Sequence, residues 1–199
     1  DMSCMAAIVA GNSDMTFNDC TAECGSYFAL THCVNGWQEE VADITVTGGD
    51  IHTKKECVLV KSHNMMLDLC DVNISSDKGI LVHTIVNDDP CATKVTKDVF
   101  GVNVVMTDMD VKGDLLHEDT TREMWVMLNS TQLTGAIQNA NLALDKGSKW
   151  TATADSDVVF VTDVEPAQID APAGVTITAK GAEAGEFALA SGGKLVVTA

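Results

Sequence analysis

Neighbouring carboxylates are the residues of this sequence whose types and spacing are best suited to catalysis. Asp88 and Asp89 are adjacent, and Asp108 follows them along the chain. Paired carboxyl groups can work as acid and base, or as acid and nucleophile, at a glycosidic bond. The sequence Asp88-Asp89-Pro90 is also ordinary turn chemistry, because aspartate and proline both favour turns. Asp88, Asp89 and Asp108 are therefore candidate catalytic acids, and a role in turns is the favoured alternative.

A second acidic pair suggests metal chemistry. Asp71 and Asp108 occupy the same position in a repeated pattern described below, as does Asp19. If the repeats stack, Asp71 and Asp108 lie about 5 Å apart. Carboxylates that close repel each other unless water, a turn amide or a cation lies between them. Calcium prefers such oxygen ligands. Turn capping is favoured, and a calcium site at Asp71 and Asp108 is the alternative. No other cofactor is expected.

Tryptophan supplies the candidate ligand contact. The chain has three tryptophans, Trp37, Trp125 and Trp150. Trp150 falls on an apolar position of the repeated pattern, so we expect it in the core. Trp125 precedes Val126, which is predicted to point inward, and alternation along a strand then points Trp125 outward. An exposed indole can pack against a sugar ring, and Trp125 is therefore the candidate ligand-binding residue.

The basic and imidazole side chains give no comparable pattern. The single arginine, Arg122, has Glu118, Asp119 and Glu123 as neighbours, which favours a solvated ion-pair cluster over the proton-abstracting base of a lyase. The five histidines have no HxxxH or HxH spacing, so strand-end or surface positions are favoured over metal ligation.

Seven cysteines are confined to the first half of the chain. They are Cys4, Cys20, Cys24, Cys33, Cys57, Cys70 and Cys91. Zinc sites need matched pairs of closely spaced cysteines, and none is present. An odd number leaves at least one thiol unpaired or joined to another chain. Interior thiols that behave as small hydrophobic groups are favoured, with one or two disulfides in an exported protein as the alternative.

Charge and length bound the class of protein. The formal net charge of −17 repels nucleic acid and anionic lipid, so neither is an expected partner. The charge favours solubility over cation binding or attraction to basic partners.

No run reaches the roughly 18 apolar residues of a membrane helix, so no membrane insertion is predicted. The chain begins at Asp1, which favours a processed or excised segment. We expect a secreted or cell-surface location with the signal removed.

The elements that position these residues are predicted by a repeated hydrophobic pattern. Two apolar residues lie two apart, and a third follows about five residues later. The repeats are Met15, Phe17, Ala22; Ile44, Val46, Ile51; Leu67, Leu69, Ile74; Val104, Met106, Val111; Val126, Leu128, Leu133; and Leu142, Leu144, Trp150. The spacing of two is typical of strands with alternate side chains inward. A strand–corner–strand unit that recurs in this way predicts a stacked solenoid.

The gap within each repeat carries turn-forming residues. The residue after the second apolar position is Asn18, Thr47, Cys70, Thr107, Asn129 or Asp145. In a stack these side chains would form a column at one corner and satisfy backbone groups there. Helix signals are scarce, and residues 36–43 and 138–146 could each hold one turn of helix.

The predicted fold is all-β, a single-stranded right-handed parallel β-helix of roughly eight to ten rungs within one domain, residues 1–199. Residues 1–40 form a cysteine-rich cap or divergent first rungs. Residues 87–100 form an inserted loop, and residues 180–199 form the last rungs or a cap that covers the open hydrophobic end.

Particular phrases strengthen this fold prediction. VKGD at 111–114, LTGAI at 133–137, LALD at 142–145, SKWTATADS at 148–156 and IDAPAGVTI at 169–177 resemble rungs of right-handed parallel β-helix proteins of the pectin-lyase-like superfamily. The similarity is to the adhesin-like and autotransporter-like bacterial extracellular type. It covers roughly residues 43–199, and the first forty residues depart from it.

The resemblance implies a fold more than an activity, because that superfamily holds lyases, hydrolases, adhesins and passive scaffolds. Its hydrolases carry Asn-Thr-Asp and Gly-His-Gly motifs, and this chain has neither. We therefore favour a non-enzymatic scaffold or adhesin-like module that binds a polysaccharide or a surface protein along a flat face. The alternatives are a carbohydrate-active enzyme, either polysaccharide lyase or glycoside hydrolase, and a structural subunit of a larger fibre.

Overall fold

The structure is a computed structural model that describes residues 4–9, 11–32, 39–89 and 100–199. Strands dominate these residues, and the one helical element among them is the short 3-10 helix η1 (Pro166–Gln168). The first strands are β1 (Cys4–Val9), β2 (Ser13–Cys24), β3 (Tyr27–His32), β4 (Val41–Thr53), β5 (Val58–Lys61), β6 (Asn64–Cys70), β7 (Asn73–Ser76), β8 (Ile80–Ile85), β9 (Val102–Thr107) and β10 (Asp110–Lys112). The others are β11 (Asp114–His117), β12 (Met124–Asn129), β13 (Gln132–Thr134), β14 (Ile137–Leu144), β15 (Lys149–Thr151), β16 (Ser156–Phe160), β17 (Ile169–Asp170), β18 (Thr176–Lys180), β19 (Gly185–Ala188) and β20 (Lys194–Thr198).

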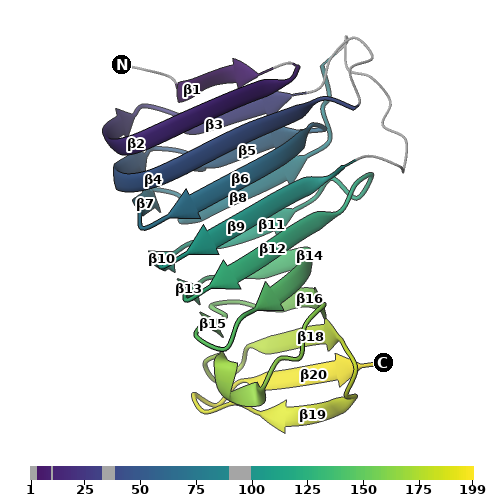
Figure 1. Cartoon of the computed structure of the whole chain (residues 1–199). Helices are drawn as coiled ribbons and strands as arrows, with labels where there is room; N and C mark the ends of the chain where they lie inside the picture. The colour runs from purple at the N-terminus through teal and green to yellow at the C-terminus, as the bar shows by residue number, and fades with distance from the viewer. Residues whose placement is uncertain (1–3, 10, 33–38, 90–99) are drawn as a thin grey trace.

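One long sheet holds most of the strands and curls about 320° round an axis. Its main path runs β1-β3-β5-β8-β11-β14-β12-β9-β6-β4-β2, with β7, β16, β18, β19 and β20 attached to it. A second sheet joins β10, β13, β15 and β17. Among the described strands the pairs are parallel, apart from β19 with β20. Figure 1 shows these layers lying over one another from the N-terminal to the C-terminal end of the chain.

The pairing repeats in sets of three strands that follow one another along the chain, called strand sets below. The strands β9, β10 and β11 form one set, and they pair in parallel with β12, β13 and the start of β14. On the other side β9 pairs with β6, and β11 pairs with β8. A parallel strand cannot follow its partner directly, because the chain must first cross back to the same starting edge. Here the other two strands of each set make that return.

Register confirms the hydrophobic pattern read from the sequence. Leu67 lies opposite Ile44, Val104 opposite Leu67, and Val126 opposite Val104. The third positions also align, since Leu133 lies between Val111 and Trp150 in the second sheet. The predicted apolar residues therefore form files that run along the axis of the curled sheet.

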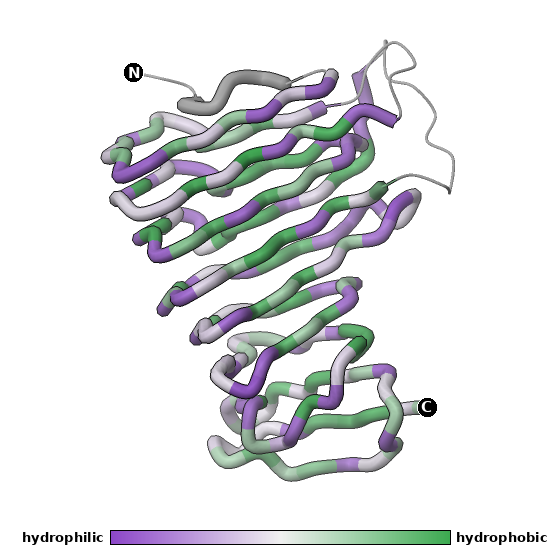
Figure 2. Tube along the Cα trace, in the orientation of Figure 1, coloured by the Kyte–Doolittle hydropathy of each residue, from purple (hydrophilic) through white to green (hydrophobic). Residues whose placement is uncertain are grey.

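These files make up the core. Ile44, Leu67, Val104 and Val126 are completely buried, and so is Trp150, as predicted. Each fully buried aliphatic side chain contributes about 1.5–3 kcal/mol relative to an exposed one. Figure 2 shows hydrophobic and hydrophilic residues alternating along the long strands. Buried and more exposed positions alternate in the same way along β9 and β12.

The expected helical turn at residues 138–146 is wrong, because β14 occupies Ile137–Leu144. Its first residues pair with β11 and its last four with β12, and Asn139, with a φ of 55°, bends the strand between them. Pairing with strands distant in sequence outweighs local propensity here. For residues 36–43, Val41 begins β4, and residues 33–38 lie outside the described part.

The two ends of the sheet differ. At the N-terminal end β2 and β3 pair in parallel with β4 and β5, so residues 11–32 extend the same sheet. Phe17 is half-buried and packs edge-on against Phe28, with ring centroids 5.2 Å apart. At the C-terminal end β19 turns back antiparallel to β20. The expected loop at 87–100 can be followed only at its ends, because residues 90–99 lie outside the described part.

Two glycines with the same φ test how closely the strand sets stack. Gly49 and Gly174 both have a φ of 89°, but a Cβ at Gly49 would overlap the backbone of Cys20, whereas a Cβ at Gly174 would meet no atom within 4 Å. We expect Gly174→Ala to cost about 1 kcal/mol from left-handed strain alone, and Gly49→Ala about 3 kcal/mol. Urea unfolding gives both free energies. Equal costs would contradict the close approach of β2 and β4.

Candidate functional site

One corner of each strand set is built from residues in the left-handed backbone region. Asp19, Gly48, Asp71, Asp108 and Ser130 all have φ between 49° and 67°. They follow Asn18, Thr47, Cys70, Thr107 and Asn129, which lie opposite one another in register. The column of small, mostly polar side chains predicted for this corner is therefore present across these five positions. Aspartate suits such a corner because its short polar side chain tolerates the left-handed region better than most.

The predicted calcium pair lies in this column. The residues before Asp71 and Asp108 are register partners, so the two aspartates are neighbours one strand spacing, about 5 Å, apart. The amide of Asp71 donates to the carbonyl oxygen of Thr107, 3.1 Å away, and the amide of Asp108 to that of Asn129, 3.0 Å away. Among the described residues no group of three or more histidine, cysteine or acidic side chains is placed to hold a metal ion. Calcium at Asp71 and Asp108 stays a prediction.

The candidate acids Asp88 and Asp89 lie at a different corner, where they share one lysine. Lys61 Nζ is 3.1 Å from the Asp88 carboxylate and 3.6 Å from that of Asp89. The hydrogen bond from Lys61 holds the pKa of Asp88 below its usual value. A general acid needs a raised pKa, which is the opposite direction. Asp108 follows the far end of β9 (Figure 1), and a strand of that length spans about 20 Å. The three acids do not share one site.

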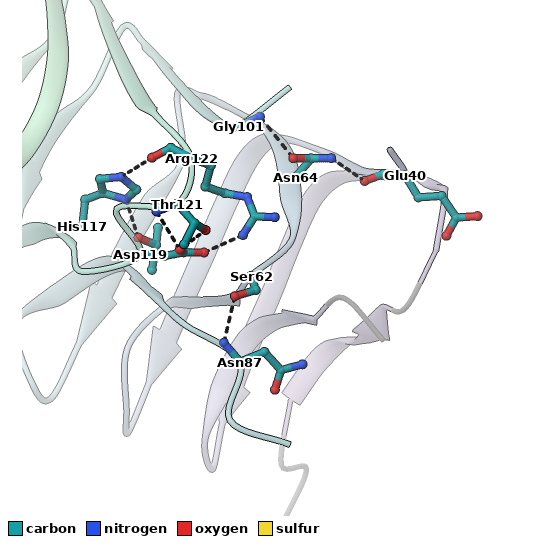
Figure 3. Close-up of polar contacts among 10 residues, drawn as sticks. Glu40, Ser62, Asn64, Asn87, Gly101, His117, Asp119, Thr121 and Arg122 are labelled. Carbon is teal, nitrogen blue, oxygen red and sulfur yellow. Dashed lines mark hydrogen bonds and ion pairs between the residues drawn. The ribbon is translucent and has the colours of Figure 1, made fainter. Parts of the chain in front are cut away.

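The corner that holds Asp88 also holds a buried polar network. It is called the loop corner below and comprises residues 62–64, 86–89, 100–101 and 117–123. The Asn64 side chain donates to Glu40 O and accepts from the Gly101 amide, both at 3.1 Å. Ser62 Oγ accepts from the Asn87 amide, 2.8 Å away. Figure 3 shows these contacts joining connections that lie far apart in the sequence. Buried backbone groups at a chain reversal need such partners.

Arg122 lies at the centre of this corner and pairs with Asp119. The two side chains are 0% and 1% exposed and make a direct hydrogen bond through Arg122 Nη1. Asp119 also accepts from the amide of Thr121 at 3.1 Å and from its hydroxyl (Figure 3). The expectation of a solvated cluster is wrong for this pair, because residues 118–123 fold over the end of β11. The separation of three residues between the partners was the available signal in the sequence.

His117 supports the same connection. It ends β11, as expected for a strand-end histidine, but it is buried. Its Nε2 donates to the carbonyl oxygen of Arg122 at 2.9 Å, and its Nδ1 faces the hydroxyl of Thr84. Because a carbonyl only accepts, Nε2 carries the proton and neutral Nδ1 accepts from Thr84. Burial lowers the pKa of His117 and keeps the ring neutral.

His63 is the one buried histidine at this corner whose ring nitrogens both have no hydrogen-bond partner within the described residues. It is 1% exposed. Burial lowers its pKa to about 4, and the charges of Arg122 and His32 act in the same direction. Local patterns do not predict the burial of His63, because a single histidine between Ser62 and Asn64 carries no periodic signal.

A hollow of about 430 Å³ opens beside the loop corner, toward the C-terminal end. Residues 120–124 form one side of it, and the facing segments of β14, β16, β18 and β20 form the rest. Its polar lining comes from His117, Thr120, Arg122, Glu123, Asn139, Asn141, Asp157, Thr178, Lys180 and Thr198. Sequence reasoning missed it, because it arises from four strands that are distant along the chain.

Trp125 lies next to this hollow. It is half-buried on the outward side of β12, as predicted, and it is the register partner of Asn141, which lines the hollow. Its Nε1 donates to a Glu123 carboxylate oxygen 3.0 Å away. The structure therefore places the one predicted ligand contact beside the hollow, and its role in binding stays a prediction.

The described cysteines can be compared with the two alternatives from the sequence, interior thiols and disulfides. Cys24 and Cys57 are buried, whereas Cys20 and Cys70 are half-buried, and Cys20, Cys57 and Cys70 carry no disulfide. Burial raises the pKa of Cys57 to about 12, so its thiol is not a nucleophile. The side chain of Cys4 and all of Cys33 and Cys91 lie outside the described part.

The buried side chains of His117, Asn64 and Asp119 bond to neighbouring groups, whereas His63 does not within the described residues, and a hollow opens beside them. His117, Asp119 and Arg122 are buried, and their hydrogen bonds hold the connection at 118–123 in place. The hollow presents amides, hydroxyls, two carboxylates and an ammonium group, with the indole of Trp125 nearby.

Comparison of the chain with protein-family models, with curated proteins and with solved structures finds no match. The resemblance to the pectin-lyase-like superfamily therefore stays a prediction from the sequence. Within the described ranges, no helix is both long enough and apolar enough to cross a membrane.

Removing Arg122 tests the buried ion pair. We expect Arg122→Met to lower the free energy of unfolding by about 3–5 kcal/mol, because Asp119 would stay buried without its counter-charge. Lys194→Met, which removes an exposed partner of Glu186, is the matched control and should cost less than about 1 kcal/mol. Chemical denaturation measures both. Similar small losses in the two variants would mean that the Arg122 pair is solvated.

The lowered pKa of His63 predicts that the folded protein loses stability in acid. Its folded-state pKa of about 4 lies below the ordinary value of 6.5, so the unfolded chain binds a proton first as the pH falls. The stability is complete above pH 6.5 and decreases toward pH 4, by about 3 kcal/mol from this residue at most.

We expect His63→Leu to remove most of that decrease in urea titrations at pH 7 and pH 4.5. A smaller slope from His117 should remain. His63→Gln, which removes the same titrating ring but keeps a polar side chain, should lose the same part of the slope. An unchanged slope in His63→Leu would contradict the prediction.

Proposed function

We propose that this chain is a right-handed parallel β-helix of roughly eight to ten rungs, of the pectin-lyase-like, adhesin-like type, and that it acts as a non-enzymatic scaffold. In this proposal it is secreted or attached to the cell surface and binds a glycan or a protein along its outer face. The observation that carries the proposal is the continuous parallel register from β2 to β14, which commits alternate side chains to the core.

The outward positions of the same strands supply the binding area. Along β6, β9 and β12 they alternate with buried positions and are half-exposed, including Met66, Val105, Trp125 and Met127. Register places Met66 beside Asn103, and Asn103 beside Trp125. A row of thioether, amide and indole side chains over several strands offers area to an elongated ligand.

The charges and acids support a scaffold over an enzyme. The net charge of −17 disfavours nucleic acid and anionic lipid as partners. Asp88 and Asp89 are paired with Lys61, and Asp108 lies in a left-handed corner at a distance from them. Catalysis at a glycosidic bond also needs a carboxyl group with a raised pKa as the general acid, whereas Lys61 lowers the pKa of Asp88.

Polysaccharide turnover tests the proposal against the carbohydrate-active enzyme. We expect no release of reducing ends and no ultraviolet-absorbing product from neutral or acidic polysaccharides, with or without calcium. We also expect the intact protein to sediment with at least one insoluble polysaccharide or to bind a surface protein.

Turnover that is lost in Asp108→Asn but kept in the matched variant Asp110→Asn would overturn the scaffold and favour the enzyme. Light scattering over a concentration series addresses the third alternative. A constant mass is expected for the scaffold, and a mass that grows with concentration would favour a fibre subunit.

A further inference from the structure

We propose that the hollow beside the loop corner binds an uncharged oligosaccharide, with Trp125 as the aromatic platform at its rim. This inference rests on the proposed scaffold function and narrows its ligand to one class and one place. The place is set by Glu123, which precedes β12, by Asn139 and Asn141 on β14, and by Asp157 on β16.

The hollow exists because successive connections differ in length. The chain passes from β11 to β12 through residues 118–123, which fold over the end of β11 and are fixed by Asp119 and Arg122. In the next strand set β14 makes the same passage by a bend at Asn139 alone. A long connection above a short one leaves a recess beneath it, and Figure 1 shows the layers narrowing from β12 toward β18.

The recess is lined with groups that suit sugar hydroxyls. Amides and hydroxyls both donate and accept, as sugar hydroxyls do. The Asn139 side chain already donates to the carbonyl oxygen of His117 at 3.1 Å, which holds it in place. The side-chain amide of Asn141 makes no hydrogen bond within the described residues, although it lines the same recess. Thr178 adds an exposed hydroxyl on the facing strand.

Trp125 is positioned to receive the apolar face of a sugar ring. It lies opposite Asn141 in register, so the indole and that amide share one side of the sheet. The 3.0 Å hydrogen bond from its Nε1 to Glu123 orients the ring at the rim. An indole offers a large apolar face at a small cost in side-chain entropy, and amides close to it can fix the orientation of the ligand.

Charge selects the class of saccharide. Two carboxylates, Glu123 and Asp157, and one ammonium group, Lys180, line the hollow. The guanidinium of Arg122 is committed to Asp119. The net charge of −17 adds a repulsive field for any polyanion. A uronate polymer would therefore meet repulsion here, whereas a neutral sugar chain would not.

Titration calorimetry with defined oligosaccharides tests the proposal. The probes are cellohexaose, xylohexaose, mannohexaose and laminarihexaose, with hexagalacturonate as the charged counterpart. We expect at least one neutral hexasaccharide to bind and hexagalacturonate to bind at least about tenfold more weakly, which corresponds to about 1.4 kcal/mol. Trp125→Ala and Asn141→Ala should each weaken the neutral ligand by about tenfold.

Thr45→Ala is the matched control, because Thr45 faces outward on β4, between Thr16 and Asp68 in register and away from the hollow. It should leave the affinity unchanged. Binding of none of the neutral probes, preferred binding of hexagalacturonate, or equal loss in Thr45→Ala would each overturn the inference. None of these outcomes contradicts the scaffold proposal. That proposal fails instead if the protein cleaves the saccharide catalytically.

Discussion

The structure depends on parallel register, in which each inward side chain of one strand set lies directly over its counterpart in the next. Side chains alternate with a period of two, so a slip of one residue between β9 and β12 would expose Val126 and bury Trp125 and Met127 instead. Because β4 pairs with both β2 and β6, one slip would also disturb the pairs on either side of it. Register therefore fixes the core and the outer face at once.

Corners are the places where this constraint is hardest to satisfy. The chain must reverse without leaving buried amides unpaired, and the two kinds of corner do this differently. At the corner of Asp71 and Asp108 single left-handed residues turn the chain, and their amides bond to the next strand set. At the loop corner the connection at 118–123 folds over the end of β11, and side chains such as Asn64, Ser62 and the Asp119–Arg122 pair bond to backbone and side-chain groups there.

The first kind of corner could be predicted from the sequence, whereas the second could not. Local rules govern the first, since apolar residues two apart and a following Asp or Asn are visible in a few letters around Asp108. The burial of Arg122 depends on a connection folding over β11, which local patterns do not encode. The helical turn expected at 138–146 failed for a related reason, because β14 is held by β11, β12 and β16.

The candidate site likewise combines a feature that local sequence patterns predict with one that depends on distant segments. Alternation along a strand predicted the outward position of Trp125, but the hollow beside it depends on the difference between the connection at 118–123 and the bend at Asn139. Core register cannot vary without disturbing neighbouring strand sets, whereas the length of a connection changes only the local corner. The repeated strands therefore supply the core and the outer face, whereas the connections decide where a hollow opens. The proposed saccharide site combines both, since Trp125 lies on β12 and the hollow depends on the change in connection length.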